Sequence, residues 1–150
     1  MRPTVPPAIV FMLHLGLAWL IDTYIGFGRI NFKGQEALAI CLFLAGTGVI
    51  LMAILTMFRA RTTVDPISPD RASKLVTNGI FKLSRNPIYL GLLWLLLSWI
   101  IWLGSMPSML LGATFVWYMS TFQIRAEEVA LEKNFGDDFS SYKNQVRRWL

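Results

Sequence analysis

Arg85, Asn86, Pro87 and Tyr89 form the first polar block that could bind a charged ligand in this 150-residue sequence. They stand at the start of a long apolar run, where Pro87 suits the first turn of a helix and Asn86 suits its cap. The free amide groups of a helix N-terminus, together with a nearby arginine, attract anions. Taken alone, the block is explained more simply as a capped membrane helix with interfacial Arg85 and Tyr89.

A second polar block follows the last apolar run and contains the adjacent glutamates Glu127 and Glu128. Its helical pattern continues to Gly136, which is a typical helix stop. Glu128 and Glu132 lie four residues apart on this helix, and like charges at that spacing are mildly destabilising. We therefore expect a cation from another segment to offset them.

The end of the chain is predicted to form one more helix, capped by Asp137 or Asp138. This helix combines an apolar stripe with neighbouring cations, which is typical of an amphipathic helix on a membrane surface. It could cover an opening that faces the membrane. The stripe contains Phe139, Tyr142, Val146 and Trp149, and the cations are Lys143, Arg147 and Arg148.

These blocks are expected to bring Arg85, the two adjacent glutamates, Tyr142 and Arg147 or Arg148 to one membrane surface. The set suits a ligand that is both anionic and cationic and that reacts with an apolar co-substrate from the lipid. A metal site is not predicted, because there is one histidine, one cysteine and no acidic cluster beyond the second block.

The elements that must position these residues are predicted to be membrane-spanning helices. The composition is 55% hydrophobic and 15% charged, whereas soluble domains carry about 25% charged residues. The predicted fold class is all-α, a polytopic integral membrane protein with about four spans. The charge-free run at 86–124 is far longer than the roughly 20 residues that cross a bilayer, so it must turn at Gly104–Pro107. The predicted spans are 8–28, 37–58, 87–103 and 107–124.

Lysine and arginine are strongly biased toward one side of this arrangement. The N-terminus, the loop at 59–86 and the tail at 125–150 carry most of them, which predicts that both termini are cytoplasmic. A single domain at 1–150 in a prokaryotic inner membrane is the expected organisation. A signal peptide at the first span is less favoured, since two prolines precede the apolar core and no clean cleavage site follows. The cations suit lipid headgroups, and nucleic acid is not an expected partner.

Several other residues inside the spans are expected to be structural. His14 and Asp22 fall on roughly opposite sides of their helix and do not form a ready pair. The run from Gly46 to Gly48 has the form of a cofactor-binding G-x-G, but close packing of helices is the preferred explanation. Cys41 is expected to be buried and inert.

Both polar blocks, in their order and spacing, resemble the isoprenylcysteine carboxyl methyltransferase and phospholipid methyltransferase superfamily. The resemblance covers more than half of the chain and lies in its C-terminal part. The segments that carry it are Thr62–Pro66, Leu75–Phe81, Ser84–Gly91, Arg125–Glu128, Phe135–Gly136 and Tyr142–Trp149.

This resemblance implies an integral membrane enzyme that transfers a methyl group from S-adenosylmethionine to a lipophilic acceptor. It also implies that the arginine segment and the glutamate pair line the cofactor pocket, and that the C-terminal segment closes it. Asn86 departs from the family pattern, because many relatives have a titratable histidine there. The implied catalytic residues are Arg85, Glu127 and Glu128, and the implied cofactor-binding residues are Arg85, Asn86, Pro87, Tyr89, Glu127, Glu128, Tyr142 and Arg147, with Arg148 as a further candidate.

The class of methyl acceptor stays open at this point. An isoprenylcysteine-like carboxylate needs no general base, whereas a phospholipid amine or a hydroxyl must lose a proton, which Glu127 or Glu128 could take. A non-enzymatic membrane subunit that uses the same residues to dock a partner is the alternative from another class. A sterol-type reductase is disfavoured, since such enzymes are much longer, and no oligomeric state is predicted.

Overall fold

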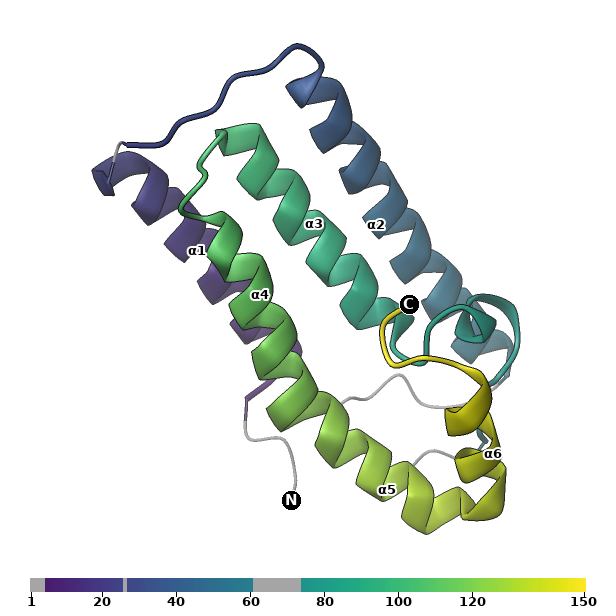
Figure 1. Ribbon diagram of the computed structural model, residues 1–150. Helices are drawn as coiled ribbons and strands as arrows, with labels where there is room; N and C mark the ends of the chain where they lie inside the picture. The colour runs from purple at the N-terminus through teal and green to yellow at the C-terminus, as the bar shows by residue number, and fades with distance from the viewer. Residues whose placement is uncertain (1–4, 26, 61–73) are drawn as a thin grey trace.

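The computed structural model describes residues 5–25, 27–60 and 74–150. These residues confirm the predicted all-α class, and Figure 1 shows how the helices are arranged. A short 3-10 helix, η2 (Gly79–Lys82), precedes α3, and a π-helical segment, η3 (Met119–Ile124), joins α4 to α5. Residues 61–73 of the predicted loop, including Thr62–Pro66, lie outside the described residues. The helices are α1 (Pro7–Ile25), α2 (Gln35–Arg59), α3 (Pro87–Leu103), α4 (Met109–Tyr118), α5 (Arg125–Phe135) and α6 (Asp137–Gln145).

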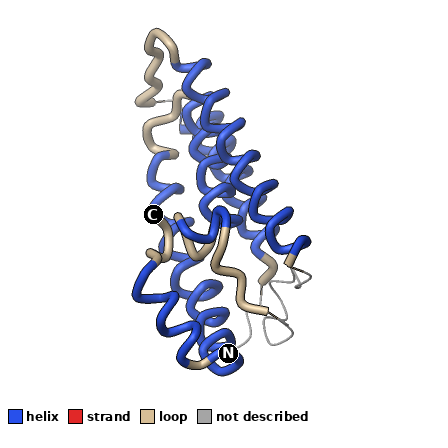
Figure 2. The backbone as a smooth tube through the Cα atoms, turned by 90° about the vertical axis from the view of Figure 1, so that its right-hand side faces the viewer, coloured by secondary structure: helices blue, strands red, loops and turns tan. Residues whose placement is uncertain are grey.

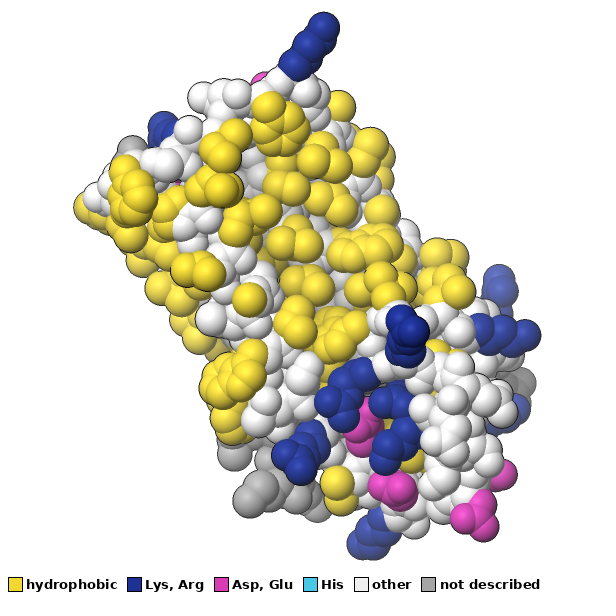
Figure 3. All heavy atoms as spheres, in the orientation of Figure 1, with side chains coloured by type: hydrophobic (Ala, Val, Ile, Leu, Met, Phe, Trp, Pro, Cys, Tyr) yellow, Lys and Arg dark blue, Asp and Glu magenta, His cyan; other side chains and the backbone are white. Residues whose placement is uncertain are grey.

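Two helices, α1 and α2, are long and apolar enough to cross a membrane, with 19 and 25 residues, and α3 is a shorter apolar helix of 17 residues. Large hydrophobic side chains that a soluble protein would bury are exposed, such as Phe58 at 78% and Leu110 at 71%. In Figure 3, hydrophobic side chains cover the helices, whereas basic and acidic ones gather at the end formed by α5 and α6. The chain is therefore a membrane protein, and spans at α3 and at α4 with η3 stay predictions.

The most extensive contact between the described helices is that of α2 with α3, which lie side by side in Figure 1. A Cβ atom on Gly91 would lie 2.7 Å from the Gly46 carbonyl oxygen and 2.5 Å from Cγ1 of Ile50. Because glycine has no Cβ atom, it lets the two backbones come this close. The predicted packing role is confirmed for Gly46, whereas a Cβ atom on Gly48 would meet open space.

The loops that join α1 to α2 and α3 to α4 lie together at the end opposite α5 and α6 (Figure 2). Gly104 ends α3 with a φ of 71°, which confirms the predicted turn between the two helices. Near this turn, Arg29 donates two hydrogen bonds of 3.0 and 2.6 Å to the Asp22 carboxylate. His14 Nδ1 instead lies 2.8 Å from the Val10 carbonyl oxygen. The prediction that His14 and Asp22 do not pair is confirmed.

The last helix differs from its prediction at both ends. Its cap is Gly136, and no side-chain capping bond is made there. Asp137 lies in the first turn instead, where its negative charge interacts favourably with the helix dipole. The helix ends at Gln145, and Val146 is extended with φ −124° and ψ 133°. The predicted helical stripe through Val146 and Trp149 is therefore wrong, because the chain leaves the helix before both residues.

The predicted burial of Cys41 is also wrong, since its side chain is exposed; its inertness stays a prediction. The residues of α2 that are buried are Ala39, Gly46, Val49 and Ala53. Cys41 lies two residues after Ala39, about 200° around the helix, and so faces away from α3.

Candidate functional site

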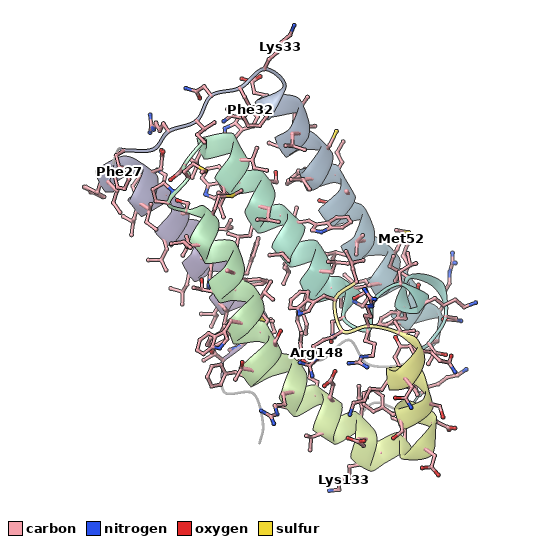
Figure 4. The ribbon with its side chains drawn as sticks, in the orientation of Figure 1. Phe27, Phe32, Lys33, Met52, Lys133 and Arg148 are labelled. Carbon is pink, nitrogen blue, oxygen red and sulfur yellow. The ribbon has the colours of Figure 1, made fainter. Side chains whose placement is uncertain are left out.

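Both polar blocks meet where the N-terminus of α3, the start of α5 and the tail at 146–149 come together. Pro87 starts α3, as predicted, and is buried. Gly136, with a φ of 49°, ends α5 as predicted and reverses the chain, so that α6 and the tail return to α3. Figure 4 shows Arg148 of this tail between the start of α3 and α5.

Glu128 is held by two arginines from different segments. Arg85 Nη2 donates to Oε1 at 2.8 Å, while Arg148 donates from Nε to Oε1 at 3.1 Å and from Nη2 to Oε2 at 2.6 Å. The side chains of Glu128 and Arg85 are 10% and 9% exposed, so their charges are largely removed from water. Lys143 Nζ lies 3.7 Å from Glu132. The prediction that outside cations offset this pair of glutamates is confirmed.

Arg85 connects the segment before α3 to the end of the chain. Its Nη1 donates to the Lys143 carbonyl at 2.8 Å, and its backbone N–H donates to the Arg147 carbonyl at 3.0 Å. Its Nε atom is buried and has no hydrogen-bond partner among the described residues. An orphaned donor of this kind fits an anionic ligand group that completes its hydrogen bonding.

Glu127 lies in different surroundings from its neighbour. Its Oε1 accepts hydrogen bonds from the Tyr89 hydroxyl and, at 2.8 Å, from Gln123 Nε2. The pKa of Glu127 is raised from its ordinary 4.5 to about 7, chiefly by burial and also by the charge of Glu128, whereas the two hydrogen bonds lower it. In the part of the chain that the structure describes, Glu127 makes no ion pair.

Gln123 is a site residue that sequence reasoning missed. It is 2% exposed and lies in η3, one turn before Glu127. π-Helical turns are frequent at functional sites, but nothing in the local sequence announces this one. The available signal is that Gln123 brings a side-chain amide to the end of a charge-free run, just before the segment with the glutamate pair.

The tail at 146–149 crosses the start of α3. Asn86 occupies the predicted cap position without a side-chain capping bond; its Nδ2 donates instead to the Arg148 carbonyl at 2.9 Å. Trp149 Nε1 donates to Ser120 Oγ in η3 at 3.0 Å. The Arg147 side chain is exposed and only its carbonyl contacts this region, so Arg148 is the arginine of the tail that reaches the glutamates.

Tyr142 is buried and faces η2. Its hydroxyl donates to the Phe81 carbonyl at 2.7 Å. Burial raises the pKa of Tyr142 to about 12, although Arg85 lowers it, so the hydroxyl remains a donor at neutral pH.

A cavity of about 100 Å³ lies among these side chains. An adjacent cavity of about 430 Å³ shares the wall formed by residues 74–76. Among the described residues, no group of histidine, cysteine and acidic side chains could hold a metal ion. Of the predicted site residues, Arg85, Asn86, Glu127, Glu128 and Tyr142 line the smaller cavity, together with apolar residues such as Leu131 and Phe139.

Parts of this chain are similar in sequence to known proteins. A family model described as phospholipid methyltransferase matches residues 35–138. The chain is 35% identical over 72 residues to a protein-S-isoprenylcysteine O-methyltransferase of Schizosaccharomyces pombe, covering 48% of this chain and 30% of that protein. It is 28% identical over 99 residues to a probable protein-S-isoprenylcysteine O-methyltransferase of Oryza sativa subsp. indica, covering 66% of this chain and 52% of that one.

A protein of Haemophilus influenzae described as uncharacterized is 46% identical over 63 residues, which are 42% of this chain and 100% of that protein. The chain spans about half or less of the length of the two relatives described as methyltransferases. No solved structure matches it.

Proposed function

Because the chain belongs to the phospholipid methyltransferase family, we propose that it methylates a lipophilic acceptor with S-adenosylmethionine as the methyl donor. The proposed acceptor is an isoprenylcysteine-like carboxylate or a related lipid-soluble molecule, in line with the relatives from Schizosaccharomyces pombe and Oryza sativa. The description of the matching family favours a phospholipid amine as the second candidate.

The observation that carries this proposal is the pairing of charges around the smaller cavity. S-adenosylmethionine supplies a methyl group on a positively charged sulfur, and it also carries a carboxylate, an ammonium and an adenine. The Nε atom of Arg85, buried and without a partner among the described residues, fits the carboxylate. Glu127, which no arginine neutralises among the described residues, fits a place beside the sulfonium. The charged groups of the site therefore fit this cofactor.

The proposed contribution of the protein is to position the reactants and to exclude water. Holding an acceptor and a methyl carbon in line can contribute about 7–11 kcal/mol to a transfer reaction. The apolar residues Leu131 and Phe139 line the cavity beside the charged groups, and a dry site favours a transition state in which charge is dispersed. Asn86 and Tyr142 hold the tail and η2 in place around it.

The size of the cavity implies that its wall moves when the donor binds. Pockets for drug-sized ligands measure about 300–1,000 Å³, whereas the site cavity measures about 100 Å³. The adjacent cavity of about 430 Å³ is large enough, and residues 74–76 form a wall of both. We propose that a shift of this segment joins the two cavities.

The site is proposed to face the cytoplasm, with both termini on that side of an inner membrane and four spans in a single domain at 1–150. The basis is the bias of lysine and arginine toward the end of the molecule that holds α5 and α6 (Figure 3).

Calorimetry with S-adenosylmethionine on protein in nanodiscs tests the proposal. We expect saturable binding by the wild type, and binding at least about tenfold weaker after Arg85→Ala, because a buried charged hydrogen bond contributes about 1.5–3 kcal/mol. Lys33→Ala, at the opposite end of the molecule (Figure 4), is the control and should bind as the wild type does. A folded wild-type protein that does not bind would contradict the proposal and favour a docking subunit.

A further inference from the structure

The two adjacent glutamates of the site differ in every contact that the structure gives them. Glu128 has both carboxylate oxygens bonded to arginine. Glu127 has its hydrogen bonds from a phenol and an amide, both on Oε1. Both residues line the same cavity. Two carboxylates in such unequal surroundings are suited to different tasks.

We propose that Glu127 is the group that takes the proton from the methyl acceptor, and that Glu128 holds the two arginines in place. The inference rests on the proposed function with its second candidate acceptor, a phospholipid amine, since a carboxylate acceptor has no proton to lose. It applies to an acceptor whose reacting nitrogen or oxygen carries a hydrogen atom.

The electron pair of the acceptor nitrogen or oxygen forms the bond to the methyl carbon, while the carbon–sulfur bond of the donor breaks and its electrons stay on sulfur. The N–H or O–H bond of the acceptor breaks, and its proton passes to a carboxylate oxygen of Glu127. The products are the methylated acceptor, the neutral thioether and protonated Glu127, which returns its proton to water.

Glu128 is a poor proton acceptor because of its contacts. Protonation would break charge-assisted bonds at 2.6 and 2.8 Å and would leave Arg85, which is 9% exposed, without its counter-ion. Such a loss is strongly unfavourable away from water. Its contacts therefore suit Glu128 to hold the two arginines rather than to accept a proton.

The surroundings of Glu127 suit the opposite role. The groups that act on it are Tyr89 from α3, Gln123 from η3 and Glu128 from its own helix. Arg85, Lys74 and Tyr142 line the same cavity. A pKa of about 7 leaves Glu127 partly ionised at neutral pH, so that it can accept a proton and release it again. Tyr89 and Gln123 are positioning residues, because they fix the orientation of the Glu127 carboxylate.

The first test compares two probes in nanodiscs loaded with S-adenosylmethionine: dodecylamine, whose nitrogen must lose a proton, and dodecanoate, which needs no base. Glu127→Gln should lower the transfer rate to dodecylamine by about 10²–10⁴-fold more than the rate to dodecanoate. The excess loss should shrink as pH rises, because hydroxide then takes the proton. Equal losses with both probes would overturn the proposal.

The second test needs no turnover. Infrared difference spectra of the wild type across pH 5–9 should show a protonated carboxyl band that disappears with a midpoint near pH 7. The band should be absent from Glu127→Gln and present in Glu128→Gln. A band that is absent from the wild type, or that disappears with Glu128→Gln instead, would overturn the assignment.

The outcomes separate the two proposals. A wild type that binds the donor and methylates dodecanoate, but shows no titrating band, keeps the proposed function and removes the role of Glu127. A folded wild type that does not bind the donor removes the proposed function, and the proton-transfer role falls with it. When neither probe is methylated although the donor binds, the infrared band decides the assignment.

Discussion

Arg148 donates two hydrogen bonds to the Glu128 carboxylate, from Nε to Oε1 at 3.1 Å and from Nη2 to Oε2 at 2.6 Å. Arg85 shares Oε1 from the other side. One carboxylate thus ties together the segment before α3, the helix α5 and the tail. The planar guanidinium allows this two-point contact, which a lysine ammonium cannot reproduce.

We expect Glu128→Gln to be among the more destabilising substitutions of a charged residue in this chain. It leaves the largely buried Arg85 without a counter-ion, and breaking such a pair costs about 3–5 kcal/mol. Arg148→Lys should cost less, because Arg148 is 36% exposed and the charge is kept. Thermal unfolding in detergent measures both. Glu132→Gln on the same helix is the control, since its exposed pair with Lys143 contributes about 0–1 kcal/mol. Equal losses of stability in Glu128→Gln and Glu132→Gln would contradict a stabilising role for the contact of Glu128 with the two arginines.

The stability of the wild type should depend on pH through Glu127. The pKa of Glu127 is higher in the folded protein, about 7, than its ordinary 4.5, so the fold favours the protonated form. This stabilising contribution is complete below pH 4.5 and is lost as pH rises through 7, by about 3 kcal/mol in all. Melting temperatures of the wild type and Glu127→Gln across pH 4–8 test this. The wild type should lose stability relative to the variant as pH rises, and parallel curves would contradict the prediction.

Tyr89→Phe and Gln123→Leu should each raise the pH at which Glu127 titrates. Both side chains donate hydrogen bonds to its carboxylate, and these bonds favour the ionised form and lower its pKa. The infrared midpoint should therefore move above 7 in both variants. A purely structural role for the two residues predicts lower melting temperatures with an unchanged midpoint.

Asn86→Asp should loosen the tail. The Asn86 amide donates to the Arg148 carbonyl at 2.9 Å, and aspartate would place an oxygen against that carbonyl. We expect a loss of about 1–3 kcal/mol and faster hydrogen exchange at 146–149, measured by mass spectrometry. Asn78→Asp is the control, because Asn78 is exposed and makes no side-chain capping bond at η2. Equal exchange rates in both variants would show that Asn86 does not hold the tail.

Gly91→Ala should destabilise the contact between α2 and α3. Its Cβ atom would lie 2.7 Å from a backbone oxygen of Gly46, so the helices must move apart; overpacking of this kind costs about 1–3 kcal/mol. Gly48→Ala meets nothing within 4 Å and should be neutral or stabilising by up to about 1 kcal/mol. Thermal unfolding of the two variants gives the comparison, and a Gly91→Ala protein as stable as Gly48→Ala would refute the close contact.

Helix starts and ends that depend on a single residue were predicted correctly. Pro87 starts α3, Gly104 ends it and Gly136 ends α5, because each of these residues has a backbone preference that acts without help from distant segments. The meeting of Arg85 with the glutamate pair also follows from the two polar blocks, since both lie at the same ends of apolar helices.

The division of labour within the site could not be predicted, because it depends on tertiary contacts. Nothing near Glu127 and Glu128 in the chain says which of them faces the arginines, since Arg85 and Arg148 come from other segments. The choice of Arg148 over Arg147 depends on where the tail leaves α6, which helical periodicity placed too late.

The π-helical segment η3 has a geometric consequence for the glutamates that follow it. A π-helical turn holds about one residue more than an α-helical turn, and each residue of an α-helix turns the chain by about 100°. η3 therefore sets an angular offset between α4 and α5. If the six residues of η3 were α-helical instead, α5 would be rotated by about 100° relative to α4, and Glu127 would leave its place beside Tyr89.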